Sequence, residues 1–159
     1  MGKVVGAALL AAVLTTPLAA QTIMSARTFV AQLYIKKTND RNFSLVSPRL
    51  MTADLYALAQ GGMAGLDYDP LCQCRSNDGL SAQILSVAGT NDQAVAKLLL
   101  RFDADRASPP QRVTLMLKRT PLVGWKLADI QSGRLPSLKA WLERRQRGGS
   151  RAAGIARAH

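Results

Sequence analysis

The sequence predicts an α+β domain in which the helices are segregated from an antiparallel sheet. Two segments, 22–37 and 48–60, place apolar residues at the three- and four-residue spacing of a helix face. Four later segments between 80 and 131 alternate apolar and polar residues, as strands with one buried face do. A run of helices followed by a run of strands is typical of the α+β class, with the helices on one face of the sheet.

Capping residues set the expected bounds of the two N-terminal helices. The first is expected to begin at Thr22, whose hydroxyl can accept a hydrogen bond from the first turn, and to end at about Lys37. The second is expected to open at Ser47 and Pro48, because proline is favoured at the first helical position, and to end at 61–62. The expected inner faces are Ile23, Ala26, Phe29, Val30, Leu33 and Tyr34 in the first helix, and Leu50, Met51, Leu55, Leu58 and Ala59 in the second.

The second half of the chain predicts an antiparallel meander after a long loop over 63–79. The expected strands are 80–90, 93–102, 112–119 and 125–131, with a tight turn at 91–92. Ser137 is expected to cap a short last helix over 138–145. The core should form where Phe29, Leu33, Leu50 and Leu55 of the helices meet Leu98, Leu115 and Leu117 of the strands.

The first twenty residues are typical of a cleavable secretory signal. Lys3 precedes an apolar run over 4–14, and small residues lead to an expected cleavage between Ala20 and Gln21. The run is shorter than the roughly 20 apolar residues that cross a bilayer, and the alternative is a buried core helix. Gln21 stands where a lipid-carrying cysteine would follow the same small residues, so no acyl anchor is expected. The sequence therefore predicts a soluble periplasmic or secreted protein with no membrane span after cleavage.

Charge and composition divide the remainder into one domain, 21–145, and a basic tail, 146–159. The chain carries a formal net charge of +11, and residues 139–159 hold six Lys or Arg against one Glu. The tail is rich in Gly, Ala and Arg and is expected to be disordered. It would either attract anionic partners or be a solvated end. No aromatic residue lies between its arginines, so no specific nucleic-acid binding is expected.

Two segments carry a resemblance to a known family. One is 66–74, with the sequence LDYDPLCQC and Asp78 shortly after it; the other is 124–130, with the sequence GWKLADI. Over about 24–143 the chain resembles a family of small exported bacterial proteins of unknown function, some of them lipoproteins, within the nuclear transport factor 2-like superfamily. The resemblance implies a strongly curved four-stranded sheet that wraps around the helices and leaves a cavity at the wide end of a cone. This chain departs from it in the three residues between Cys74 and Asp78, and function transfers poorly because the superfamily spans isomerases, hydratases and dimerisation modules.

Cys72 and Cys74 are the two cysteines of the chain, and their C-x-C spacing leaves three readings open. Export would favour a disulfide, although Cα atoms two residues apart on an extended chain are about 6.6 Å apart, near the upper limit of about 6.8 Å. Two buried thiols, or a soft-metal site for Cu(I) or Zn(II), are the alternatives. Because His159 is the single histidine, few further ligands exist, and no metal or cofactor is expected.

Acidic and aromatic residues give the remaining candidates for a site. Asp67 and Asp69 could act as acid and base or hold a hard cation, but aspartates before proline also form turns. Trp125 and Asp129 are four residues apart on one expected strand and should share a face. On the concave side Asp129 would resemble the general base of isomerases of this superfamily, with Tyr34 as a hydroxyl partner. The structural alternatives are a core Trp125 and an Asp129 that caps a bend.

The sequence favours an exported, non-catalytic binding or interaction module over an enzyme. Its partner would be an unknown small molecule or protein, met in the cone cavity or on the outer face of the sheet, and the module could work as a homodimer. One alternative is a small-molecule enzyme of isomerase or hydratase type with Asp129 as base. The other is thiol redox or metal handling at Cys72 and Cys74.

Overall fold

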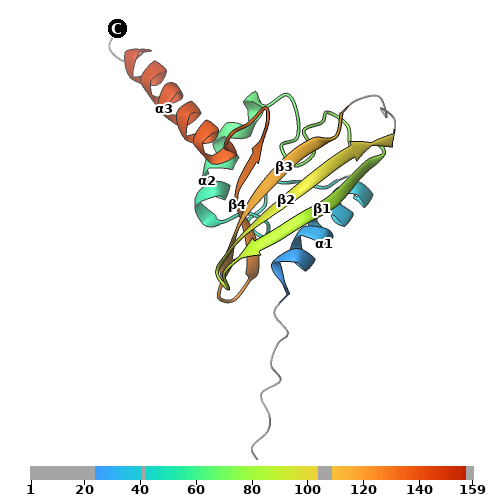
Figure 1. Ribbon diagram of the computed structural model, residues 1–159. Helices are drawn as coiled ribbons and strands as arrows, with labels where there is room; N and C mark the ends of the chain where they lie inside the picture. Colours follow the sequence, from blue (N-terminus) through green and yellow to red (C-terminus); the bar gives the residue numbers. More distant parts are fainter. Residues whose placement is uncertain (1–23, 41, 104–108, 157–159) are drawn as a thin grey trace, which may run out of the picture.

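The predicted α+β class is confirmed by the computed structural model, which describes residues 24–40, 42–103 and 109–156 (Figure 1). The predicted signal segment 1–20 and its cleavage position lie outside the described residues. The elements, in chain order, are α1 (Ala26–Asn39), α2 (Ala53–Gly62), a 3₁₀ turn (Met63–Gly65), β1 (Leu80–Gly89), β2 (Gln93–Phe102), β3 (Gln111–Thr120), β4 (Gly124–Ser132) and α3 (Leu138–Ala156).

The four strands form one antiparallel sheet in the order β1-β2-β3-β4. In Figure 1, α1 lies behind the sheet, while α2 and α3 lie beside β4. The sheet is neither closed nor strongly curled, so the cone implied by the resemblance is not confirmed. The strand bounds agree with the sequence prediction to within one residue at each end, because alternation of apolar and polar residues is strong in all four strands.

The two faces of the sheet differ in composition, and we call them the core face and the open face. The core face carries the buried residues Ala94, Ala96, Leu98, Leu100, Val113, Leu115, Leu117, Trp125, Leu127 and Ile130. Leu33 of α1 and Leu55 of α2 belong to the same buried cluster, as predicted, whereas the predicted core residues Phe29 and Leu50 are only partly buried and pack against it. The open face carries Val95, Lys97, Leu99, Arg101, Arg112, Thr114, Met116, Lys118, Lys126, Ala128, Asp129 and Gln131 on β2 to β4.

Both N-terminal helices begin later than predicted. Ser25 caps α1 through a 3.1 Å hydrogen bond from the Thr28 N–H, and the expected cap Thr22 lies outside the described residues. The opening of α2 at Ser47 and Pro48 is wrong, because the chain makes a turn there and the helix starts after Thr52. The residues between turn and helix instead pair with the edge of β4.

That pairing joins the chain before α2 to β4 at two points. The N–H of Leu127 donates to the carbonyl of Leu50 over 2.7 Å, and the N–H of Thr52 donates to the carbonyl of Leu127 over 2.8 Å. The contact is a parallel bridge between Met51 and Leu127. It covers the outer edge of β4 and fixes where α2 begins.

The last helix is longer than predicted. Ser137 caps it as expected, by accepting a 3.0 Å hydrogen bond from the Ala140 N–H. The helix then continues to Ala156, so the expected end near Arg145 is wrong. The segment contains no proline, and its three glycines cost a helix only about 1 kcal/mol each. Its first half packs on α2, and its second half projects away from the sheet (Figure 1).

A β-bulge in β4 places Asp129 on the open face. Met116 of β3 pairs with Asp129, and the next residue, Leu117, pairs with Leu127. Ala128 lies between these two partners and is the extra residue of the bulge. The predicted common face of Trp125 and Asp129 is therefore wrong. Trp125 lies buried on the core face, and Asp129 shares the open face with Met116.

None of the described helices is long and apolar enough to cross a membrane. Separately, the buried residues of α1, α2, α3 and the core face of the sheet form one apolar cluster in the described part of the chain.

Leu115 tests the assignment of the two faces. Leu115 is fully buried, so Leu115→Ala is expected to lower the free energy of unfolding by about 2–5 kcal/mol. Its neighbour Thr114 lies on the open face, and Thr114→Ala is expected to change the free energy of unfolding by about 0.5 kcal/mol or less. Chemical denaturation followed by circular dichroism measures both. Equal losses in the two variants would mean that the register is wrong.

Candidate functional site

Tyr34, predicted as a hydroxyl partner in catalysis, lies in the core and holds the loop over 66–78. Its hydroxyl donates a 2.7 Å hydrogen bond to the carbonyl oxygen of Leu71. Burial, and secondarily the charge of Asp69, raise the pKa of Tyr34 well above its usual value. The hydroxyl therefore keeps its proton and serves as a donor that ties the loop to α1.

The acidic residues of the loop each have a partner of their own. Asp69 forms a 2.9 Å ion pair with Lys37 of α1 and accepts a 2.8 Å hydrogen bond from the Leu71 N–H. Asp67 is exposed and pairs with Arg75 over 2.7 Å, and the hydrogen bond from Arg75 lowers the pKa of Asp67. These are contacts of turn-forming aspartates. Among the described residues, no group of three acids, histidines or cysteines could hold a metal ion.

Cys72 and Cys74 are joined in a disulfide, the first of the three readings, with Cα atoms 5.1 Å apart. The extended-chain separation used in the prediction does not apply, because Gln73 between them has φ 57° and turns the chain. Cys72 is fully buried. The bridge closes the tip of a loop that α1 already holds through Tyr34 and Lys37.

Gln73 is a structural residue that sequence reasoning missed. Its side chain is buried, donates a 2.7 Å hydrogen bond to the Pro70 carbonyl and accepts one of 2.6 Å from the Ser132 hydroxyl at the end of β4. The loop is thereby fastened to the sheet as well as to α1. A left-handed glutamine has no local signature in a sequence, because its partners lie far along the chain.

Asp129 acts as a second cap for α3. Its carboxylate accepts hydrogen bonds from the Ser137 hydroxyl at 2.7 Å and from the Lys139 N–H at 2.9 Å. A carboxylate at a helix N-terminus satisfies free N–H groups and complements the helix dipole. The structure does not bring Asp129 together with Tyr34 or Trp125, which both lie in the core.

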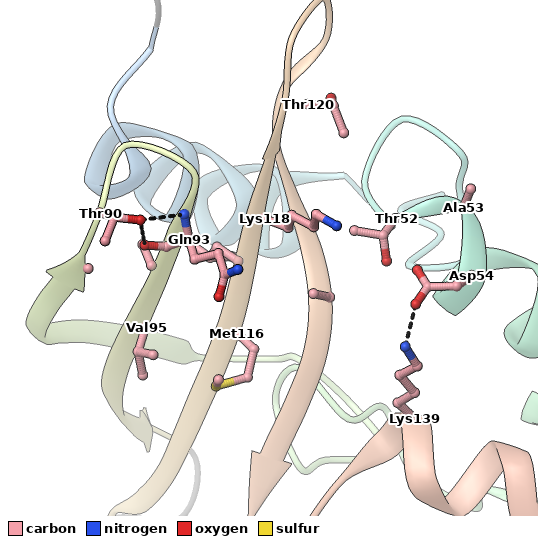
Figure 2. Close-up of a pocket in the computed structure, with 14 residues that line it drawn as sticks. Thr52, Ala53, Asp54, Thr90, Gln93, Val95, Met116, Lys118, Thr120 and Lys139 are labelled. Atoms are coloured by element: carbon pink, nitrogen blue, oxygen red, sulfur yellow. Dashed lines mark hydrogen bonds and ion pairs between the residues drawn. The ribbon is translucent and has the colours of Figure 1, made fainter.

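A groove lies on the open face of the sheet, beside the start of α2 (Figure 2). Its volume is about 910 Å³. Apolar side chains of Val95, Met116 and Ala128 form the part that lies on the sheet, and Thr52 with Asp54 at the start of α2 forms one side. No sequence-predicted site residue lines it, because it is assembled from β2, β3, β4 and the first residues of α2 and α3.

The polar side of the groove contains one ion pair and one unpaired lysine. Asp54 of α2 is bonded to Lys139 of α3, and this hydrogen bond is the main reason that the pKa of Asp54 falls to about 2. The ammonium group of Lys118 has no ion pair or hydrogen bond within the described part of the chain. Figure 2 shows the Lys118 side chain extending from β3 toward the side formed by Thr52 and Asp54.

Thr52 holds the one buried side-chain oxygen that lacks a hydrogen-bond partner among the described residues. Thr52 is only 5% exposed, and although it stands at the cap position of α2 it makes no side-chain cap hydrogen bond. It lies close enough to Asp54 to contribute to the lowered pKa of that carboxyl, yet no hydrogen bond of normal geometry joins them. A buried hydroxyl without a partner destabilises a fold by about 1–3 kcal/mol.

Comparison with known proteins adds no further assignment. The chain matches no protein-family model, no curated protein and no solved structure.

Removal of the Asp129 carboxylate tests its capping role. Asp129→Ala is expected to lower the free energy of unfolding by about 0.5–2 kcal/mol, as loss of a helix cap does. Gln131→Ala, on the same face of β4 and away from the cap, is the matched control. Denaturant titration followed at helix and tryptophan wavelengths measures both. Unchanged stability in Asp129→Ala would contradict the capping role.

The disulfide is expected to fix the loop and not the whole domain. A bridge between residues two apart closes almost no loop, so reduction should leave the melting temperature nearly unchanged. Amide hydrogen exchange over 67–78 should rise, because the loop tip loses its constraint. Intact mass spectrometry of the native protein should show a chain about 2 Da lighter than the dithiol. Two free thiols, or a large fall in melting temperature on reduction, would contradict this.

Proposed function

We propose that the protein is a non-catalytic binding module whose ligand site is the groove on the open face. The observation that carries the proposal is the convergence of an apolar floor with the unpartnered, buried Thr52 hydroxyl and the unpaired Lys118. Small-molecule sites are typically clefts of about 300–1,000 Å³ with mostly apolar walls and few polar groups that orient the ligand. The groove has that size and that composition.

The surroundings of the former catalytic candidates support binding over chemistry. Asp129 is occupied by two hydrogen bonds at α3, and Tyr34 keeps its proton in the core. A general base needs a free lone pair within reach of the substrate proton. Neither residue lines the groove. The interior beneath the sheet is filled by leucines, which also favours the outer face as the ligand site.

Export is part of the proposal. A signal segment at 1–20 would deliver the module to the periplasm or the exterior, where a disulfide between Cys72 and Cys74 suits an oxidising environment. We also propose, from the segments 66–74 and 124–130, that the chain belongs to the nuclear transport factor 2-like superfamily. A homodimer is also part of the proposal, because β1 is an end strand of the described sheet and end strands can pair with a second chain.

A neutral amphiphile tests the groove. Titration of ¹⁵N-labelled protein with octan-1-ol is expected to shift the amide signals of Val95, Met116 and Ala128, because the alkyl chain should bury against this floor. Val95→Trp fills the groove and should weaken binding at least about tenfold, the equivalent of about 1.4 kcal/mol.

Gln83→Trp is the control, since Gln83 lies on the open face of β1 outside the groove. Retained binding in Val95→Trp, or shifts confined to other surfaces, would refute the groove as the ligand site. A spectrum of Val95→Trp with native dispersion excludes misfolding as the cause of lost binding.

A further inference from the structure

The open face of the sheet is strongly and one-sidedly charged. Across β2, β3 and β4 it carries five cations and one acid, and the carboxylate of that acid, Asp129, is engaged at α3. The cations are Lys97, Arg101, Arg112, Lys118 and Lys126. None of them forms an ion pair within the residues that the structure describes. A face of this kind attracts anions and raises their rate of association.

One of these cations, Lys118, lines the groove and lies opposite a second cation on the neighbouring strand. Lys118 and Lys126 are direct cross-strand partners on β3 and β4. Like charges in that position destabilise a sheet. Lys126 relieves part of the repulsion by donating a 2.7 Å hydrogen bond to the Pro48 carbonyl, whereas Lys118 has no acceptor and extends into the groove. An anion beside Lys118 would remove the remaining repulsion.

The side of the groove opposite Lys118 supplies donors as well. It is the N-terminus of α2, where the helix dipole is positive and the cap residue makes no side-chain hydrogen bond. The Thr52 hydroxyl oxygen is covered in the ligand-free structure and lies on the Asp54 side, so its side chain must rotate about the Cα–Cβ bond to donate to a ligand oxygen in the groove. Asp54 is neutralised by Lys139, so the local charge in the absence of a ligand is positive.

From this geometry, and resting on the proposed function, we infer that the groove binds an amphipathic monocarboxylate. One carboxylate oxygen meets the Lys118 ammonium and the other meets the Thr52 hydroxyl, while the apolar body lies on Val95, Met116 and Ala128. A single negative charge matches Lys118, the one cation lining the groove that has no ion pair among the described residues, whereas a dianion such as a phosphate monoester would leave its second charge unpaired beside the Asp54–Lys139 pair.

Four probes with the same alkyl chain separate the head group from the body. Octanoate, octan-1-ol, octylammonium and octyl phosphate are titrated into the protein that consists of residues 21–159. Calorimetry gives the dissociation constants, and amide shifts give the binding positions. Octanoate is expected to bind at least about tenfold more tightly than octan-1-ol, the effect of a charge-assisted hydrogen bond. Octylammonium is expected to bind more weakly than octan-1-ol. Octyl phosphate is expected to bind more weakly than octanoate.

Two variants locate the head group. Lys118→Met keeps the length of the side chain and should reduce the preference for octanoate over octan-1-ol to about twofold or less. Thr52→Val is nearly isosteric and should reduce the preference about five- to tenfold while leaving the melting temperature equal or higher, because it removes an unpartnered buried hydroxyl. Lys97→Met removes the same charge from the same face outside the groove and is the control.

The outcomes distinguish the two proposals. Equal affinities for octanoate and octan-1-ol at the groove would overturn the carboxylate inference and leave the binding groove standing. The carboxylate inference would also be overturned if octylammonium bound more tightly than octan-1-ol, or octyl phosphate more tightly than octanoate. Equal effects of Lys118→Met and Lys97→Met on the preference for octanoate would overturn it as well. If neither octanoate nor octan-1-ol shifts the groove residues, the proposed function itself fails.

Discussion

The short pairing of the chain before α2 with the edge of β4 is the constraint on which the open-face groove depends. The Leu127 N–H donates to the Leu50 carbonyl, and the Leu127 carbonyl accepts from the Thr52 N–H. These two hydrogen bonds extend the sheet by one bridge, and α2 begins directly after it. The first turn of α2 is thereby fixed beside the open face. Without this pairing Thr52 and Asp54 would have no defined position relative to Lys118, and the polar side of the groove would not exist.

The bulge at Ala128 is the second half of the same arrangement. By adding one residue to β4 it lets Leu127 and Ile130 both face the core, although they are three residues apart. It also turns Asp129 to the open face, where its carboxylate caps α3 and so positions Lys139 next to Asp54. A single inserted residue thus links the core, the last helix and the ion pair at the groove.

Local pattern was sufficient for the sheet and insufficient for the site. The strands could be predicted because alternation of apolar and polar residues reports one buried face directly. The start of α2 could not, since Ser47 and Pro48 have the local chemistry of a helix start and only pairing with distant Leu127 overrides it. The shared face of Trp125 and Asp129 failed for a related reason, because a bulge shifts the period without changing composition. The groove combines Thr52, Lys118 and Lys139, which are far apart in sequence, so no motif marks it.

The two faces of the sheet impose different demands on neighbouring residues of the same strands. Leu115 and Leu117 of β3 are buried and stabilise the fold. On the opposite face of the same strand, Met116 gives the groove an apolar surface and Lys118 gives it a cationic one. An unpaired lysine opposite another lysine, and a buried hydroxyl without a partner, both lower stability. Both lie at the same groove, next to a helix N-terminus whose capping residue leaves it open. Local features that each oppose folding and meet at one concave surface are the pattern expected of a binding site, since the ligand supplies the missing partners.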